Sequence, residues 1–232
     1  MRPVNKSHPG DTVCYMDSQG MVINHIIQPY YDPYGNAKMP LCGNIGNYCS
    51  YCECHERESS LAIEHIVPKS QGGDEKAWNN FLLSCTICNS TKGITVISSS
   101  QCHFPHLNNT FLSFIYDQTG RIRVNPNIPL QSQEKANNLL KLTHLDRFPS
   151  TSQIPSPKDF RWQERYECWN TATKLKEYYL LKKISEDDII KAAKREGNWS
   201  IWFTVFSGMD AILSRLISDF PGTSSECFDA GN

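Results

Sequence analysis

The sequence predicts an α+β protein with a cysteine-rich core, a β-hairpin after it and a mainly α-helical C-terminal region. Three observations carry this prediction. Two C-x-x-C pairs, at 49–52 and 85–88, enclose an insert that contains a short apolar strand. Residues 111–124 read as two apolar strands around a glycine-containing turn, which is typical of a hairpin. From residue 132 onward, apolar side chains recur at helical spacing.

The composition is that of a folded protein in water. Hydrophobic residues make up 39% of the 232 residues and charged residues 20%, so a sizeable core is expected without stapling disulfides. Apolar runs are short, such as Phe81-Leu82-Leu83, and the N-terminus lacks the apolar stretch of a signal peptide. We therefore expect a cytoplasmic protein with no membrane span and with its cysteines reduced.

The net charge of -1 bears on nucleic-acid binding. A protein that binds duplex DNA unaided usually carries an excess of basic charge. Any nucleic-acid contact of this chain should therefore be local or shared with a partner.

The chain divides into three predicted segments. Residues 1–47 are rich in Gly, Pro and Tyr and are expected to form an irregular arm with one short helix. Residues 48–130 are expected to hold the cysteine-rich core and the hairpin, whose turn is Asp117-Gln-Thr-Gly120. Residues 131–232 are expected to form a helical region that docks a partner.

Within the helical region, the first helix is predicted from Ser132, and the proline-rich stretch 149–157 is predicted as a loop. Helical structure should resume near Lys158, and Ser185 with Asp188 resembles a capping box. The residues expected to face the core in the first, second and last helices are Ala136, Leu139, Leu140 and Thr143; Trp162, Tyr166, Trp169, Ala172, Leu175 and Tyr179; and Met209, Ile212, Leu213, Leu216 and Ile217.

Four of the ten cysteines form the two tight pairs, Cys49/Cys52 and Cys85/Cys88. Two residues between thiols let both reach one ion, and four thiolates can close a tetrahedron around Zn²⁺. With four ligands filled, such a zinc site is structural. The alternative is that these are buried free cysteines. Cys54 and Cys102 lie nearby in sequence, but no regular spacing assigns them to the site.

The insert between the pairs carries the candidate catalytic residues. Glu64 and the side-chain oxygen of Asn89 could bind a hard divalent cation such as Mg²⁺ or Mn²⁺, with phosphate and water completing the shell. His65 could deprotonate the attacking water, and Asn80 could hold the loop around His65. Neighbours on a strand point to opposite faces, so Glu64 and His65 share one site only where the strand ends or distorts. Alone, His65 would be read as an ordinary half-buried histidine.

These residues resemble the zinc-knuckle type of HNH endonuclease, which implies a ββα-metal (His-Me finger) core and metal-dependent hydrolysis of DNA. The three letters of the family name fall on His65, Asn80 and Asn89. The matching pattern, which covers about a fifth of the chain, is Cys49-x-x-Cys52, Glu64-His65-Ile66-x-Pro68, Gly72-Gly73, Asn80-Phe81-x-Leu83, Cys85-x-x-Cys88-Asn89 and Lys92-Gly93.

A narrower resemblance is to the PtuB-type HNH proteins of Septu anti-phage defence and of some retron cassettes. It implies a bacterial effector nuclease in a hetero-oligomer with a PtuA-type ABC/SMC-like ATPase. The segments that carry it are Met1-Arg2-Pro3-Val4, Tyr48–Glu53, Glu64–Lys69, Trp78–Cys85, Asn109–Tyr116, Gly197–Trp202 and Phe220–Thr223.

Two other functions share these residues. One is a non-catalytic, zinc-bearing module that binds nucleic acid or protein, and the other is a nuclease toxin that acts on RNA. His103 and His106 are either phosphate-site residues or ordinary loop histidines.

The crowding of aromatic residues at 199–206 predicts an exposed patch for the ATPase. A chain truncated after Phe148 is therefore expected to keep its zinc and to lose the complex.

Overall fold

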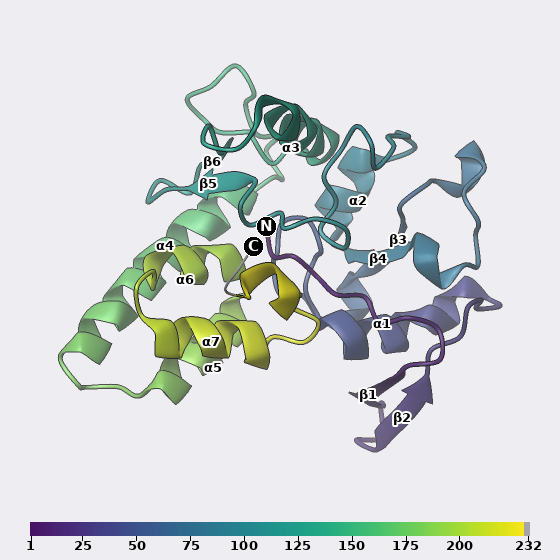
Figure 1. Cartoon of the computed structure of the whole chain (residues 1–232), viewed down its shortest axis with the longest axis horizontal. Coiled ribbons are helices and arrows are strands. Elements are labelled where there is room, and N and C mark those ends of the chain that lie inside the picture. The colour runs from purple at the N-terminus through teal and green to yellow at the C-terminus, as the bar shows by residue number, and fades with distance from the viewer. Residues whose placement is uncertain (230–232) are drawn as a thin grey trace.

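The computed structural model describes residues 1–229 of the chain (Figure 1). Its described part contains three separate two-stranded antiparallel sheets and a set of helices, most of them in the C-terminal half. The prediction of an α+β fold is confirmed. No helix in residues 1–229 is long and apolar enough to cross a membrane.

The N-terminal segment is more regular than the sequence predicts. Strand β1 (Thr12–Met16) pairs with strand β2 (Val22–Ile26), and the expected short helix follows as α1 (Lys38–Ile45). Along β1 only Val13 is buried. The hairpin therefore lacks the alternation of apolar and polar residues from which a strand is predicted. It projects from the lower right of the molecule in Figure 1.

The cysteine-rich core is a ββα unit. Strand β3 (Ala62–His65) pairs antiparallel with strand β4 (Phe81–Ser84), and helix α2 (Thr86–Lys92) follows directly. Strand β4 is buried throughout, which explains its unbroken apolar sequence. The short apolar strand lies within the insert as predicted, and the ββα unit agrees with the core that the family resemblance implies; α2 begins at Thr86, between the two cysteines of the second pair.

Two further predicted elements are confirmed beyond this unit. Strands β5 (Phe114–Tyr116) and β6 (Ile122–Val124) form the hairpin, and helix α3 (Leu130–Thr143) follows it. The four residues expected to line the core side of α3 are all buried.

The C-terminal region contains helices α4 (Arg161–Leu180), α5 (Glu186–Glu196), α6 (Trp199–Val205) and α7 (Asp210–Asp219), which gather at one side of the molecule (Figure 1). Helix α5 begins with the capping box of Ser185 and Asp188. Helix α7 ends before Pro221 and buries Ile212 and Leu216. The capping box of α5 and the burial of Ile212 and Leu216 in α7 agree with the sequence analysis.

The prediction for α4 was wrong in part about which face is buried. Its predicted aromatic stripe is mostly half-buried, and the side chain of Tyr166 is 44% exposed. Ala172 of the predicted stripe is fully buried, and Trp169, Leu175 and Tyr179 pack against the core, but the other fully buried residues of α4 are Arg161, Arg165 and Cys168. Two guanidinium groups therefore occupy core positions, which hydrophobic periodicity does not predict.

The prediction of an exposed aromatic patch was also wrong. Trp199, Trp202 and Phe206 are buried, and Phe203 packs against the ring of Trp199 at a centroid distance of 4.5 Å. The indole nitrogen of Trp199 donates to the backbone oxygen of Leu216 at 2.7 Å. These aromatics form the core of the helical region, so they are not a surface for the ATPase.

The helical region is packed against the first cysteine pair. The Glu53 carboxylate accepts a hydrogen bond from the Ser200 hydroxyl at 2.7 Å, and the backbone oxygen of Glu53 accepts one from Asn198 at 2.8 Å. The two ends of the chain also meet, since Val4 forms an antiparallel bridge with Thr223. Segments distant in sequence thus enclose the cysteine-rich core.

Candidate metal centre and active site

Four cysteine thiols meet in the interior beside α2. The Sγ atoms of Cys49, Cys52, Cys85 and Cys88 all lie within 4.8 Å of one another, and the four residues are buried. Cys85 is the N-cap of α2, where its sulfur accepts a hydrogen bond from the backbone of Cys88 at 3.4 Å. Four convergent buried thiols are the donor set of a structural zinc site, so the residues present fit Zn²⁺.

A fifth thiol, that of Cys54, borders this cluster. Its Sγ lies 3.2 Å from that of Cys52, although it does not belong to the group of four. The chain turns sharply here because Glu53 has a positive φ of 68° and the backbone nitrogen of Cys49 donates to the oxygen of Cys54. Sequence spacing did not reveal Cys54 because a C-x-x-C pair does not show how the chain turns after its second cysteine; here Ser200 of α6 also bonds the Glu53 carboxylate.

His65 lies at the end of β3, half-buried between aromatic rings. Its ring meets those of Tyr34 and Phe81 edge-on, at centroid distances of 5.1 and 5.2 Å. Its Nε2 atom lies 3.0 Å from the backbone oxygen of Glu75. A carbonyl can only accept, so Nε2 carries the proton and Nδ1 carries the lone pair. Burial lowers the pKa of His65 below its ordinary value, and the Glu75 hydrogen bond opposes this only in part.

Asn80 clamps the loop that follows His65. Its Oδ1 accepts from the backbone nitrogen of Val67 at 2.8 Å, and its Nδ2 donates to the backbone oxygens of Val67 at 2.9 Å and Asp74 at 2.8 Å. Gly73 lies against the same strand end, where a Cβ atom would come within 1.8 Å of the Val67 oxygen. The Gly72-Gly73 pair therefore permits a close approach of backbone that no larger residue allows at position 73.

Glu64 points to the other face of β3 and forms a buried ion pair. Its Oε1 lies 2.6 Å from the Nζ atom of Lys92, and both side chains are almost fully buried. Burial raises the pKa of the Glu64 carboxyl above its ordinary value, while Lys92 acts in the opposite direction. Lys92 also donates to the backbone oxygen of His65 at 2.9 Å. Lys92, to which the sequence analysis gave no role, therefore ties α2 to the strand that carries both candidate residues.

Asn89 lies on α2 and is half-buried, one helical turn before Lys92. Residues three apart share a helix face, so Asn89 lies on the side of α2 that faces β3. Among residues 1–229 no group of three His, Cys, Asp or Glu side chains other than the four cysteines could hold a metal ion. Few side chains could therefore bind a catalytic cation through an oxygen atom, and the candidates are Glu64 and Asn89.

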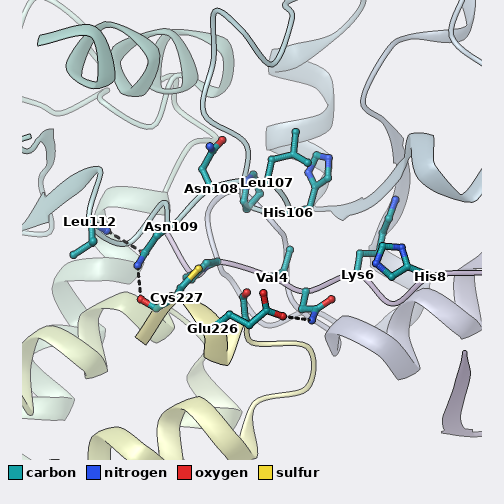
Figure 2. Close-up of a pocket in the computed structure, with 14 residues that line it drawn as sticks. Val4, Lys6, His8, His106, Leu107, Asn108, Asn109, Leu112, Glu226 and Cys227 are labelled. Atoms are coloured by element: carbon teal, nitrogen blue, oxygen red, sulfur yellow. Dashed lines mark hydrogen bonds between the residues drawn. The ribbon is translucent and has the colours of Figure 1, made fainter. Parts of the chain in front are cut away.

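His106 lines two cavities. One, of about 530 Å³, lies between the N-terminal segment, the loop after Phe104 and the C-terminal segment, and Figure 2 shows its lining side chains. The other also includes Val67, Gly73 and Asn80. Burial and the nearby Lys6 lower the pKa of His106 from 6.5 to about 4, so its imidazole is neutral at pH 7. His103, in contrast, is hydrogen-bonded to the Ser113 hydroxyl at 2.9 Å.

Comparison with known proteins identifies the class of this core. Residues 49–94 match the HNH endonuclease family, so this part of the chain is an HNH endonuclease domain. The matched range contains the four clustered cysteines, the ββα unit and the four candidate catalytic residues. The family match suggests nuclease activity and a DNA substrate. No curated protein matches the chain.

Proposed function

We propose that this protein is a metal-dependent endonuclease that hydrolyses phosphodiester bonds of DNA, with His65 as the general base. The observation that supports the proposal most strongly is the tautomer of His65 within an HNH domain. Its Nε2 is committed to the Glu75 carbonyl, which leaves the lone pair of Nδ1 to accept a proton. A water molecule beside Nδ1 would give up its proton as its oxygen attacks phosphorus.

Two features keep His65 ready for this step. Its lowered pKa keeps the imidazole neutral at physiological pH, as a base must be. The Asn80 amide and the close packing at Gly73 fix the loop that starts just after His65, so we assign Asn80 a positioning role.

We assign the catalytic cation to Glu64 and Asn89. A hard divalent cation, Mg²⁺ or Mn²⁺, would supply positive charge at the scissile phosphate. Because Oε1 of Glu64 is paired with Lys92, the second oxygen of that carboxylate is the one we assign to the cation, together with the Asn89 side-chain oxygen. Lys92 would then orient Glu64 while it holds the backbone of His65.

This assignment predicts different behaviour for one single variant and one double variant. Glu64→Gln leaves the buried Lys92 without its carboxylate, with only the His65 carbonyl left from its present partners, which should cost about 3–5 kcal/mol of stability. Adding Lys92→Met to Glu64→Gln removes the unpaired charge, so thermal stability should return. Cleavage should stay low and should require more Mn²⁺ than the wild type. If the double variant regains both stability and wild-type metal dependence, Glu64 is only the partner of Lys92.

We further propose that the nuclease works as the effector subunit of a bacterial defence complex with an ABC/SMC-like ATPase. The resemblance to PtuB-type proteins supports this, and so does the net charge of -1, which gives little non-specific attraction to DNA phosphates. With the aromatic cluster of α6 buried, other surfaces of the chain must carry the contact. Exposed apolar side chains of the helical region are Ile154, Phe160, Leu180 and Leu181.

The experiment is incubation of supercoiled plasmid with the full chain and Mg²⁺ or Mn²⁺, alone and co-purified with an ATPase of that class. We expect slow, metal-dependent cleavage by the chain alone and much faster cleavage by the complex. If the chain alone cleaves DNA as fast as the complex does, the proposal that an ATPase partner is needed is wrong. Cleavage of RNA but not of DNA would assign the chain to the nuclease toxins, and cleavage of neither would make it a binding module.

A further inference from the structure

The buried face of α4 carries positive charge directly against the cysteine cluster. The Nη1 atom of Arg161 donates to Sγ of Cys88 at 3.2 Å, and both residues are buried. Arg161 is held in place by the Asp159 carboxylate, with two hydrogen bonds of 2.7 Å, and by the backbone oxygen of Thr143 at 2.8 Å. The guanidinium of Arg161 is therefore held by several acceptors at once, and one of them is the sulfur of a cluster cysteine.

Arg165 lies one turn further along the same buried face. Its guanidinium donates to the backbone oxygens of Gly120 at 2.8 Å and Leu145 at 3.3 Å, and it has no carboxylate partner among its hydrogen bonds. A buried cation paired only with neutral carbonyls is costly unless negative charge lies close by.

The buried side chains of residues 1–229 leave an imbalance of charge that this cluster can resolve. Four cationic side chains are buried, Arg2, Lys92, Arg161 and Arg165, and so is the N-terminal ammonium group, but among residues 1–229 only three carboxylates are buried, Glu53, Glu64 and Asp159. Four thiolates around Zn²⁺ would carry a net charge of about -2, in contact with Arg161 through Cys88. A zinc-bound cluster would supply negative charge for Arg165, which has only carbonyl acceptors, and would add to Asp159 beside Arg161, whereas four neutral thiols would not.

We infer that Arg161, with Arg165 beside it, completes the zinc site as a positioning residue, so that α4 and the metal stabilise each other. The N–H···S hydrogen bond from Arg161 lowers the negative charge on the Cys88 thiolate and fixes its direction toward the ion. The family match ends at residue 94, so the residues that complete this site lie outside the domain that the family defines. A chain truncated after Phe148 lacks both arginines and should lose zinc, contrary to the expectation from sequence.

The inference rests on the zinc site, not on nuclease activity, and its test uses zinc-loaded full-length protein. Arg161→Met should release zinc to a chelator about tenfold faster or more, the size usually seen when a hydrogen bond to a metal ligand is removed. Arg161→Lys should recover part of the loss because it keeps the charge. Arg123→Met is the matched control. Arg123 also pairs with an aspartate, Asp117, but this pair lies at the surface and involves none of the four clustered cysteines. With Co²⁺ in place of zinc, the thiolate charge-transfer absorption should shift in Arg161→Met and not in the control.

A wild-type measurement keeps the test valid if Arg161→Met does not fold. Chelation of the metal from the wild-type chain should raise amide hydrogen exchange in residues 161–172 of α4. If these amides stay protected in the metal-free chain, α4 docks without the metal and the inference fails. It also fails if a folded Arg161→Met variant holds zinc as tightly as the wild type and shows an unshifted cobalt spectrum. None of these three readouts requires DNA cleavage, so the proposed function is tested separately.

Discussion

Replacing His65 with alanine is expected to lower the rate of DNA cleavage by about 10²–10⁴-fold, the usual contribution of a positioned general base. The loss follows from the removal of Nδ1, the ring atom left to accept a proton once Nε2 is bonded to Glu75. Zinc content and melting temperature should stay near those of the wild type, because the ring is half-buried and does not touch the cysteine cluster. The measurement is single-turnover cleavage of plasmid with saturating Mg²⁺.

His8→Ala is the matched control, because His8 is an exposed histidine in the N-terminal segment. The pH profile adds a second readout. Since burial lowers the pKa of His65, wild-type activity should stay level from neutral pH down to below 6.5 and then fall as the imidazole is protonated. Cleavage by His65→Ala at the wild-type rate would show that another group is the base.

Replacing Cys85 with serine is expected to abolish zinc binding and unfold the catalytic core. Structural zinc contributes on the order of 10–16 kcal/mol in small zinc domains, more than the total stability of most proteins. Cys85 also caps α2, the helix that carries Asn89 and Lys92, so its loss should release β3 from α2. Elemental analysis and circular dichroism of the purified variant measure both effects.

Cys102→Ser controls for the loss of a buried cysteine as such. Cys102 is fully buried, but its thiol donates to the backbone oxygen of His103 and lies outside the cluster. This variant should keep one zinc ion per chain. A Cys85→Ser protein that folds normally, or a wild-type protein that folds without zinc, would contradict the structural zinc site.

The parts of the fold that sequence predicted depend on local rules. The two C-x-x-C pairs, the capping box at Ser185 and the core face of α3 each follow from spacing within a few residues. The same is true of the ββα unit, in which motif residues and elements follow in order along the chain. The sequence could therefore predict which four cysteines cluster without any knowledge of the remaining chain.

The features that sequence missed depend on contacts between distant segments. Arg161 and Arg165 are buried because α4 lies against thiols more than seventy residues earlier in the chain. Cys54 comes beside Cys52 through a turn at Glu53, and the carboxylate of Glu53 is hydrogen-bonded to Ser200 in α6. The aromatic cluster of α6 is buried against α7 and not exposed, since apolar composition alone does not say which surface will cover it.

The most direct test of the central claim is cleavage of plasmid DNA by the zinc-loaded full chain in ¹⁸O-labelled water with Mg²⁺. Hydrolysis with His65 as base predicts metal-dependent cleavage, one ¹⁸O atom in each newly formed terminal phosphate, and no product from His65→Ala within the same time. The central claim is contradicted if the wild-type chain, alone and with an ABC/SMC-like ATPase, leaves DNA intact under every divalent metal tried, or if His65→Ala yields the same labelled product at the same rate.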